Sequence, residues 1–307
     1  VRSVLTSIGL SIFSCTTAWA CGFHNYAPQP TFVDQMLASD HVVLARPDLA
    51  NPFRYTVVER LAGSGTFQEI PYLVDSRSRR RLASDAGTSV LFARDAADGS
   101  WNRAVFVDSA MEPVVRHVMK SLPDWSQPSA TPRIEFFAEL ADHPNATIHQ
   151  MALRELDLAP YDLLRKLPIA IDPARLMRPL NDPTQQQLKP IRILLLGLSE
   201  DESVPGVFAA GLDNQVRVDG STLGAYATAL IELEGVQAVN TMIAPYLTDS
   251  GLSLLAREVL IQAMGMHADT DDAALHAAIV SSVRVALEHE PSLVGAVVRN
   301  FGWRVGQ

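Results

Sequence analysis

The sequence has almost no cysteine: Cys15 and Cys21 are the only two among 307 residues. If the first 20 residues are removed on export, as argued below, Cys21 alone remains, and one cysteine cannot form an internal disulfide. With 48% apolar residues, a chain of this length has enough material for a sizeable core without crosslinks. We therefore expect the fold to rest on apolar packing.

Positive charge is also scarce. The chain has 25 Lys and Arg against 34 Asp and Glu, a net charge of −9. The imbalance lies from Thr131 onward, with 13 basic against 22 acidic residues (13 − 22 = −9), whereas residues 36–130 carry 11 of each sign. Nucleic-acid binding relies on cationic contacts to phosphates, so it is not expected. The glycine-rich motifs of dinucleotide and nucleotide binding are absent from the sequence, and no cofactor is predicted.

Long apolar runs are missing as well. The longest N-terminal run, Val4–Phe13, is too short to span a bilayer. It follows Arg2 and precedes Ala18-Trp19-Ala20, so residues 1–20 are interpreted as a signal peptide. The protein is then exported, to a periplasm or outside the cell, and Val1 fits an alternative bacterial start codon. A lipid anchor on Cys21 is disfavoured, because Ala18 stands where a lipoprotein signal prefers leucine.

The first half after the signal alternates apolar and polar residues with a period of two, which indicates strands. Gly63-Ser64-Gly65 and Asp98-Gly99-Ser100 supply turns. A longer gap before the fourth strand contains the arginine cluster Arg77–Arg81. Five short strands of this spacing predict a small closed barrel of the OB kind over residues 21–120. The strands are expected at His41–Arg46, Phe53–Arg60, Glu69–Val74, Ser89–Arg94 and Trp101–Val107.

The second half has the 3.6-residue period of helices. A segment with three prolines, residues 121–132, is interpreted as a linker, and residues 133–307 as a helical array. The fold class is thus mixed and α-dominated. The apolar stripes of the helices are expected to form the core of the array. The residues expected in this core are Leu194, Leu195, Leu198, Leu230, Leu233, Leu255, Val259, Ile279 and Val283.

The array resembles HEAT repeats. Glu135–Leu140, Asp142–Pro144 and Met151–Leu156 look like one helix–turn–helix unit of that family, and the last segment maps onto Ile193–Leu198 at an offset of 42. This resemblance implies a curved solenoid that binds partner proteins and implies no catalysis.

The stretch from Cys21 to Gly63 resembles the netrin-like domain of tissue inhibitors of metalloproteinases. The matching features are Cys21 itself, Pro28-Gln29 with Phe32, Asp40 before Val42–Ala45, and Tyr55–Glu59. The resemblance implies that the Cys21 amine and carbonyl cover a protease zinc. The family's second cysteine would fall at Phe23, and its disulfide partners are absent.

Two sets of residues are candidates for chemistry. Cys21 and His24 offer thiol, amine and imidazole groups that suit a soft metal, although a complete zinc site needs more ligands. A tethered N-terminus is the alternative for them. Cys21 is also a candidate for partner binding. The cluster Arg77, Arg79, Arg80 and Arg81 is interpreted either as a surface for a phosphate or an acidic partner, or as a solvated loop that docks on the acidic array.

The leading hypothesis is an exported, non-enzymatic scaffold that binds another protein through its helical array. A metalloprotease inhibitor acting through Cys21 is the first alternative, and an enzyme with a site between the two parts is the second.

Overall fold

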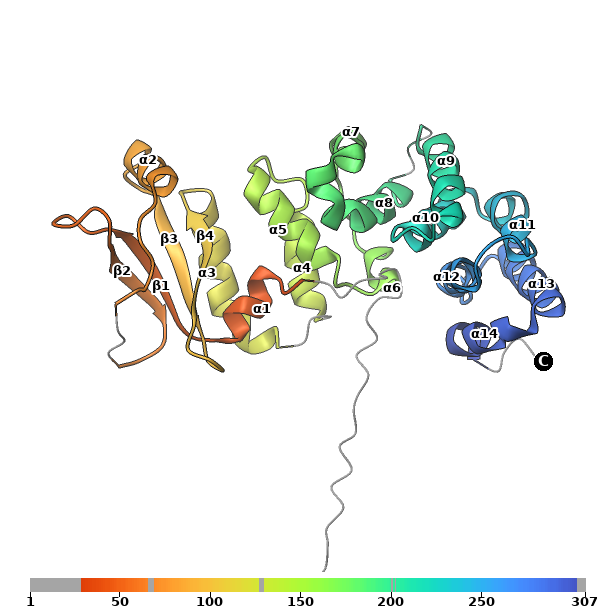
Figure 1. Ribbon diagram of the computed structural model, residues 1–307, viewed down its shortest axis with the longest axis horizontal. Helices are drawn as coiled ribbons and strands as arrows, with labels where there is room; N and C mark the ends of the chain where they lie inside the picture. Colours follow the sequence, from red (N-terminus) through yellow and green to blue (C-terminus); the bar gives the residue numbers. More distant parts are fainter. Residues whose placement is uncertain (1–28, 66–68, 127–129, 200, 202, 303–307) are drawn as a thin grey trace, which may run out of the picture.

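A sheet with three helices lies at one end of the molecule, and a helical region extends away from it (Figure 1). The computed structural model describes residues 29–65, 69–126, 130–199, 201 and 203–302. The predictions at Cys21 and His24, and the signal peptide, lie outside these residues.

The sheet has four antiparallel strands in the order β2-β1-β3-β4. The hairpins β1–β2 and β3–β4 are joined by pairing of β1 with β3. The edge strands β2 and β4 do not pair with each other, so the sheet is open. Four of the five predicted strands are present. Their bounds are β1 Ser39–Pro47, β2 Tyr55–Ala62, β3 Ser89–Asp95 and β4 Trp101–Val107.

The prediction of a closed five-stranded barrel is wrong. The expected strand Glu69–Val74 makes only an isolated bridge, between Leu73 and Arg54. Pro71 has no N–H to donate to a ladder, and Ile70 and Val74 turn their side chains into the core over one face of the sheet. The segment therefore covers the sheet instead of closing it.

Helices cover both faces of the sheet. On one face, α1 (Phe32–Leu37) and α3 (Met111–Ser121) pack on Val42, Leu44 and Leu91. On the other, α2 (Ser76–Ser84) packs through Leu82 on Val43, Val90 and Phe92. Alternate residues of β1 serve the two cores, as the two-residue period of a strand requires.

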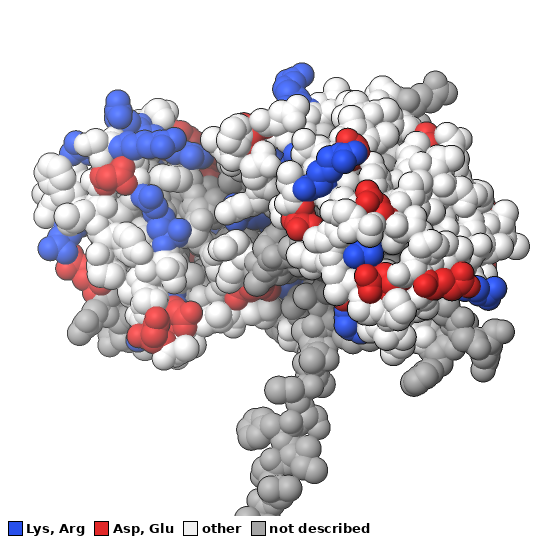
Figure 2. All heavy atoms as spheres, turned by 45° about the vertical axis from the view of Figure 1, so that its right-hand side comes forward, with Lys and Arg blue, Asp and Glu red and all other residues white. Residues whose placement is uncertain are grey.

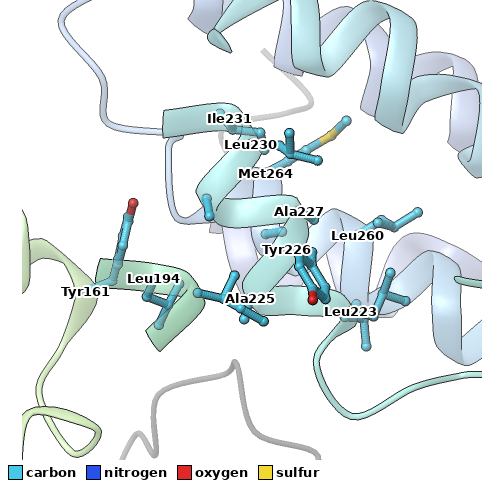
Figure 3. Close-up of a cluster of buried hydrophobic side chains, with 14 of the residues drawn as sticks. Tyr161, Leu194, Leu223, Ala225, Tyr226, Ala227, Leu230, Ile231, Leu260 and Met264 are labelled. Atoms are coloured by element: carbon cyan, nitrogen blue, oxygen red, sulfur yellow. The ribbon is translucent and has the colours of Figure 1, made fainter. Parts of the chain in front are cut away.

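The helical region contains eleven α-helices within the described residues. Helix α10 lies at its centre and contacts α8, α9 and α12. Figure 3 shows the α10 side chains Leu223, Tyr226, Leu230 and Ile231 lying between Leu194 of α8 and Leu260 and Met264 of α12. The bounds are α4 Thr131–Glu139, α5 Ala146–Leu156, α6 Tyr161–Leu164, α7 Pro173–Met177, α8 Lys189–Gly197, α9 Val204–Arg217, α10 Leu223–Glu234, α11 Ala244–Leu247, α12 Leu254–Gly265, α13 Ala273–His289 and α14 Val294–Phe301.

The predicted array core is confirmed at most positions. Six of the nine predicted side chains are buried, and two, Leu198 and Leu233, are partly buried against the same core. Leu255 is the exception, at 50% exposure. Helix α12 packs against both α10 and α14 from Ala256 onward, and its first turn extends beyond those neighbours.

One apolar core crosses from the sheet into the helical region. Val42, Leu91 and Met111 of the sheet part share a cluster with Phe137 of α4 and Ile148 of α5. In the segment predicted as a linker, α3 continues into a short 3-10 helix at Leu122–Asp124, and Trp125 is 3% exposed within this same cluster. The division of the chain into two domains at residues 121–132 stays a prediction.

Within the described residues, none of the helices combines the length and the apolar character needed to cross a membrane.

Candidate binding surfaces

The predicted arginine cluster lies on helix α2 and not on a loop. The side chain of Asp75 caps the helix by accepting hydrogen bonds from the Ser78 N–H at 2.8 Å and the Ser78 hydroxyl at 2.7 Å. These bonds hold the pKa of the Asp75 carboxyl well below its usual range. Arg103 of β4 donates to the same carboxylate at 3.0 Å, so the cap is tied to the sheet.

Ser78 and Leu82 are the buried residues of α2 and face the sheet. Their positions determine the directions in which the arginine side chains point around the helix. At about 100° per residue, Arg79 then lies on one flank of the helix, Arg77 and Arg81 on the other, and Arg80 on the outer side. The guanidinium of Arg79 lies 4.9 Å from the ring centre of Phe53, and that of Arg81 lies 4.3 Å from the ring centre of Phe106. No carboxylate of the described residues forms an ion pair with any of the four arginines of α2.

Exposed apolar side chains adjoin these arginines. Leu49 is 103% exposed, Phe53 54% and Leu73 65%. Phe53 and Leu73 are neighbours in space, because Val74 N donates to the Phe53 carbonyl at 2.9 Å and Leu73 bridges to Arg54. Leu49 lies in the turn just before them, where Asp48 N donates to the Arg54 carbonyl at 2.9 Å. We call Leu49, Phe53, Leu73, Arg77, Arg79, Arg80 and Arg81 the α2 surface. Figure 2 shows lysine and arginine side chains gathered along the upper edge of the sheet part.

A second exposed apolar surface lies on the helical region. The Ser253 hydroxyl donates to Asp219, which joins the end of α9 to the start of α12. The adjacent side chains Val218, Leu254 and Leu255 are 64%, 40% and 50% exposed, and we call them the array patch. Asp219 has a positive φ of 49°, the only such value among the described non-glycine residues, which turns the chain sharply after α9.

A buried ionic cluster joins the two parts of the molecule. Arg133 of α4 is fully enclosed and donates to Glu155 of α5 at 2.6 and 2.9 Å. It also donates to Thr31 at 2.7 Å and Asp34 at 2.9 Å, at the start of α1. Glu155 in turn accepts the Val33 N–H at 3.0 Å. This cluster fixes the helix that leads into the sheet against the first helices of the array.

A second polar cluster lies inside the array. Glu232 of α10 accepts from the Tyr161 hydroxyl at 3.0 Å and pairs with Arg165 at 2.9 Å. The His267 ring is 1% exposed and faces the Thr228 carbonyl at 3.2 Å through Nε2. Glu232 lies 3.7 Å from Nδ1 of His267, but the Glu232 carboxylate already accepts from Tyr161 and pairs with Arg165. Burial of the ring lowers the pKa of His267 to about 4. These contacts fix α6 against α10.

Two hollows are present among the described residues. One, of about 210 Å³, lies between α1, β4 and α5 and is lined by Gln35, Thr147, Gln150 and Arg154 among others. The other, of about 310 Å³, is lined by Ile169, Ile171, Leu195 and neighbouring residues. Neither lining brings two titratable side chains together, so neither has the usual composition of a catalytic cleft.

The structure thus places the four predicted arginines together on one helix. It puts them on the sheet part, packed through Ser78 and Leu82, so the prediction that they form a loop is wrong. Among the described residues there is no group of three or more His, Cys, Asp or Glu side chains that could hold a metal. Sequence reasoning missed the apolar part of the α2 surface; the one local signal is that Leu49 stands among the turn residues Asp48, Asn51 and Pro52.

Comparison with known proteins gives no match from any family model, any curated protein or any solved structure.

Proposed function

We propose that this protein is an exported, non-enzymatic scaffold that binds another protein through its helical region, in the manner of a HEAT-like array. The array patch is the observation that carries the proposal. Three large apolar side chains are exposed together there, on helices whose opposite sides are buried in a continuous core. Contiguous exposed apolar surface on a rigid frame is typical of protein–protein contact sites.

The chemistry around the patch indicates the kind of partner. Asp219 adjoins Val218, and Glu258 lies one helical turn beyond Leu254 and Leu255. The helical half also carries the acidic excess of the chain, 22 acidic against 13 basic residues from Thr131 onward. We therefore expect a partner surface with apolar side chains at its centre and basic side chains at its rim.

The test compares three forms of the full chain as bait in extracts of the compartment that receives the exported protein. They are the parent, the double variant Leu254→Ser/Leu255→Ser, and the control Val207→Ser, which changes a side chain of α9 that is 46% exposed. The parent and the control should retain the same defined protein at a fixed ratio, and the double variant should lose it. Retention of the same proteins by all three forms would contradict the proposal.

A further inference from the structure

We propose that the α2 surface docks on an anionic phospholipid bilayer, which would place the scaffold at a membrane surface without a spanning helix. This inference goes beyond the proposed protein binding, because it concerns the opposite part of the molecule and a different class of partner.

The charge of this surface is suited to lipid phosphates. Helix α2 contains four arginines and no acidic residue. The acids at its two ends are already engaged, Asp75 by Ser78 and Arg103 and Asp85 by Gly87 and Thr88. Glu69 is paired with Arg54. Guanidinium groups match phosphate geometry through paired N–H donors, and a cluster of four to eight of them is the usual signature of anionic-lipid binding.

Two of the arginines are held in position before any ligand arrives. Arg79 and Arg81 lie over the rings of Phe53 and Phe106, at 4.9 and 4.3 Å from the ring centres. These contacts hold each guanidinium close to the surface of the protein. Less side-chain freedom is then lost when a phosphate binds than for arginines free in solvent.

The exposed apolar side chains supply the second half of a membrane contact. Leu49 is 103% exposed in the turn between β1 and β2. This turn lies at the outer end of the sheet part (Figure 1). The backbone of this turn is largely satisfied from within, because the Asp48 side chain accepts from the N–H groups of Ala50 and Asn51 at 2.8 Å. A turn with paired amides and a projecting leucine can enter the interface at low cost.

The arrangement favours a bilayer over a soluble acidic protein. A soluble acidic partner would use only the charges of the arginines and would leave the apolar side chains of this surface without a role. A bilayer also buries the apolar side chains that lie beside the arginines, Leu49 and Phe53, which are 103% and 54% exposed. The acidic excess of the chain lies in the helical region, which extends away from this end, so it is held apart from the anionic surface (Figure 1).

The experiment is co-sedimentation of the full chain with vesicles. Vesicles of phosphatidylcholine mixed with phosphatidylglycerol are compared with vesicles of phosphatidylcholine alone, at low and at physiological salt. The parent should bind the anionic vesicles and not the neutral ones. The double variant Arg77→Gln/Arg80→Gln should bind about 25-fold more weakly, at about fivefold for each arginine removed. Leu49→Ser should weaken binding by about tenfold at both salt concentrations, because its contribution is apolar.

The control is Arg284→Gln, which removes an exposed arginine of α13 in the helical region and should bind like the parent. Each variant should fold, because none of the altered side chains is buried. Thermal melting checks that it does. Two results would overturn the proposal. One is equal binding by the parent and the Arg77→Gln/Arg80→Gln variant. The other is insensitivity to Leu49→Ser together with full displacement by a soluble poly-glutamate peptide, which would assign the surface to an acidic protein segment.

Discussion

Arg133 is the largest side chain that the described structure encloses completely. A buried guanidinium is costly unless its charge and its N–H groups are satisfied. Four hydrogen bonds to three residues, Thr31, Asp34 and Glu155, engage Nε and Nη2 of this guanidinium, and Glu155 supplies the compensating buried charge. Nη1 is buried without a partner among the described residues. The cluster therefore stabilises one relative arrangement of α1, α4 and α5, which is the joint between the sheet and the array.

Replacing Arg133 with methionine should destabilise the protein by on the order of 3–5 kcal/mol, because Glu155 would be left buried without its counter-charge. The matched control is Arg116→Met. Arg116 pairs with Glu59 and Glu112, but all three side chains are at least 40% exposed, so this variant should unfold close to the midpoint of the parent. Urea unfolding followed by circular dichroism measures both. Equal unfolding midpoints for the two variants would contradict this account of the joint.

His267 makes the stability of the array depend on pH. Burial holds its pKa at about 4 in the folded protein, and an unfolded histidine titrates near pH 6.5. Between these values the unfolded chain takes up a proton that the folded protein does not. The free energy of unfolding therefore falls as the pH drops from about 6.5 towards 4, and the loss amounts to on the order of 3 kcal/mol.

The variant His267→Gln removes this titration. Its stability should fall less between about pH 7 and about pH 5 than that of the parent, as measured by urea midpoints. The control His289→Gln changes an exposed histidine of α13 and should keep the slope of the parent. A residual slope is expected in all forms, because burial also lowers the pKa of His149. If His267→Gln shows the slope of the parent, His267 is not the group responsible.

At the scale of elements, α10 organises the array. It contacts helices on three sides, and Leu230 at its centre is 0% exposed. Leu230→Ala should cost on the order of 2–5 kcal/mol through lost apolar burial and the cavity left behind. Leu255→Ala, the same change on the exposed first turn of α12, should shift stability by only about half a kcal/mol. Thermal melting compares them, and a parent-like melting temperature for Leu230→Ala would show that α10 is not central to the core.

Much of the element pattern could be predicted from the sequence, because strand and helix periods are local signals. The strand Trp101–Val107 has the predicted bounds, and Asp272 caps α13 as a polar residue at a helix start should. Helix α2 was not predictable in this way. Its sequence has one large apolar residue, Leu82, so no apolar stripe marks it, and it depends on the Asp75 cap and on the sheet beneath. Leu255 fits the stripe of α12 by spacing, but the position of α10 and α14 decides its burial.

The binding surfaces could be predicted only in part. The four arginines are adjacent in the sequence, so their cluster was visible. Leu49 and Leu73 join them only because the chain returns across the end of the sheet, and Val218 comes close to Leu254 only because the Ser253 hydroxyl reaches Asp219. The ionic joint of Arg133 with Asp34 spans 99 residues and has no local signature.

At the scale of the whole molecule, the sheet part and the array form one frame with a shared core and a buried ionic joint. The α2 surface lies at one end of this frame (Figure 1), and the array patch lies on the helical region. We expect a ligand at the α2 surface to change local protection there and to leave the array as it was, because the core beneath α2, around Val43, Val90 and Phe92, is separate from the array core.

Hydrogen exchange of the full chain, with and without vesicles that contain phosphatidylglycerol, tests the central claim that function lies on separate surfaces of the molecule. The account predicts slower exchange limited to the turn after β1, the segment around Leu73 and helix α2, with unchanged rates throughout α8, α10 and α12. Slower exchange centred on the array, or no change at the α2 surface, would contradict it.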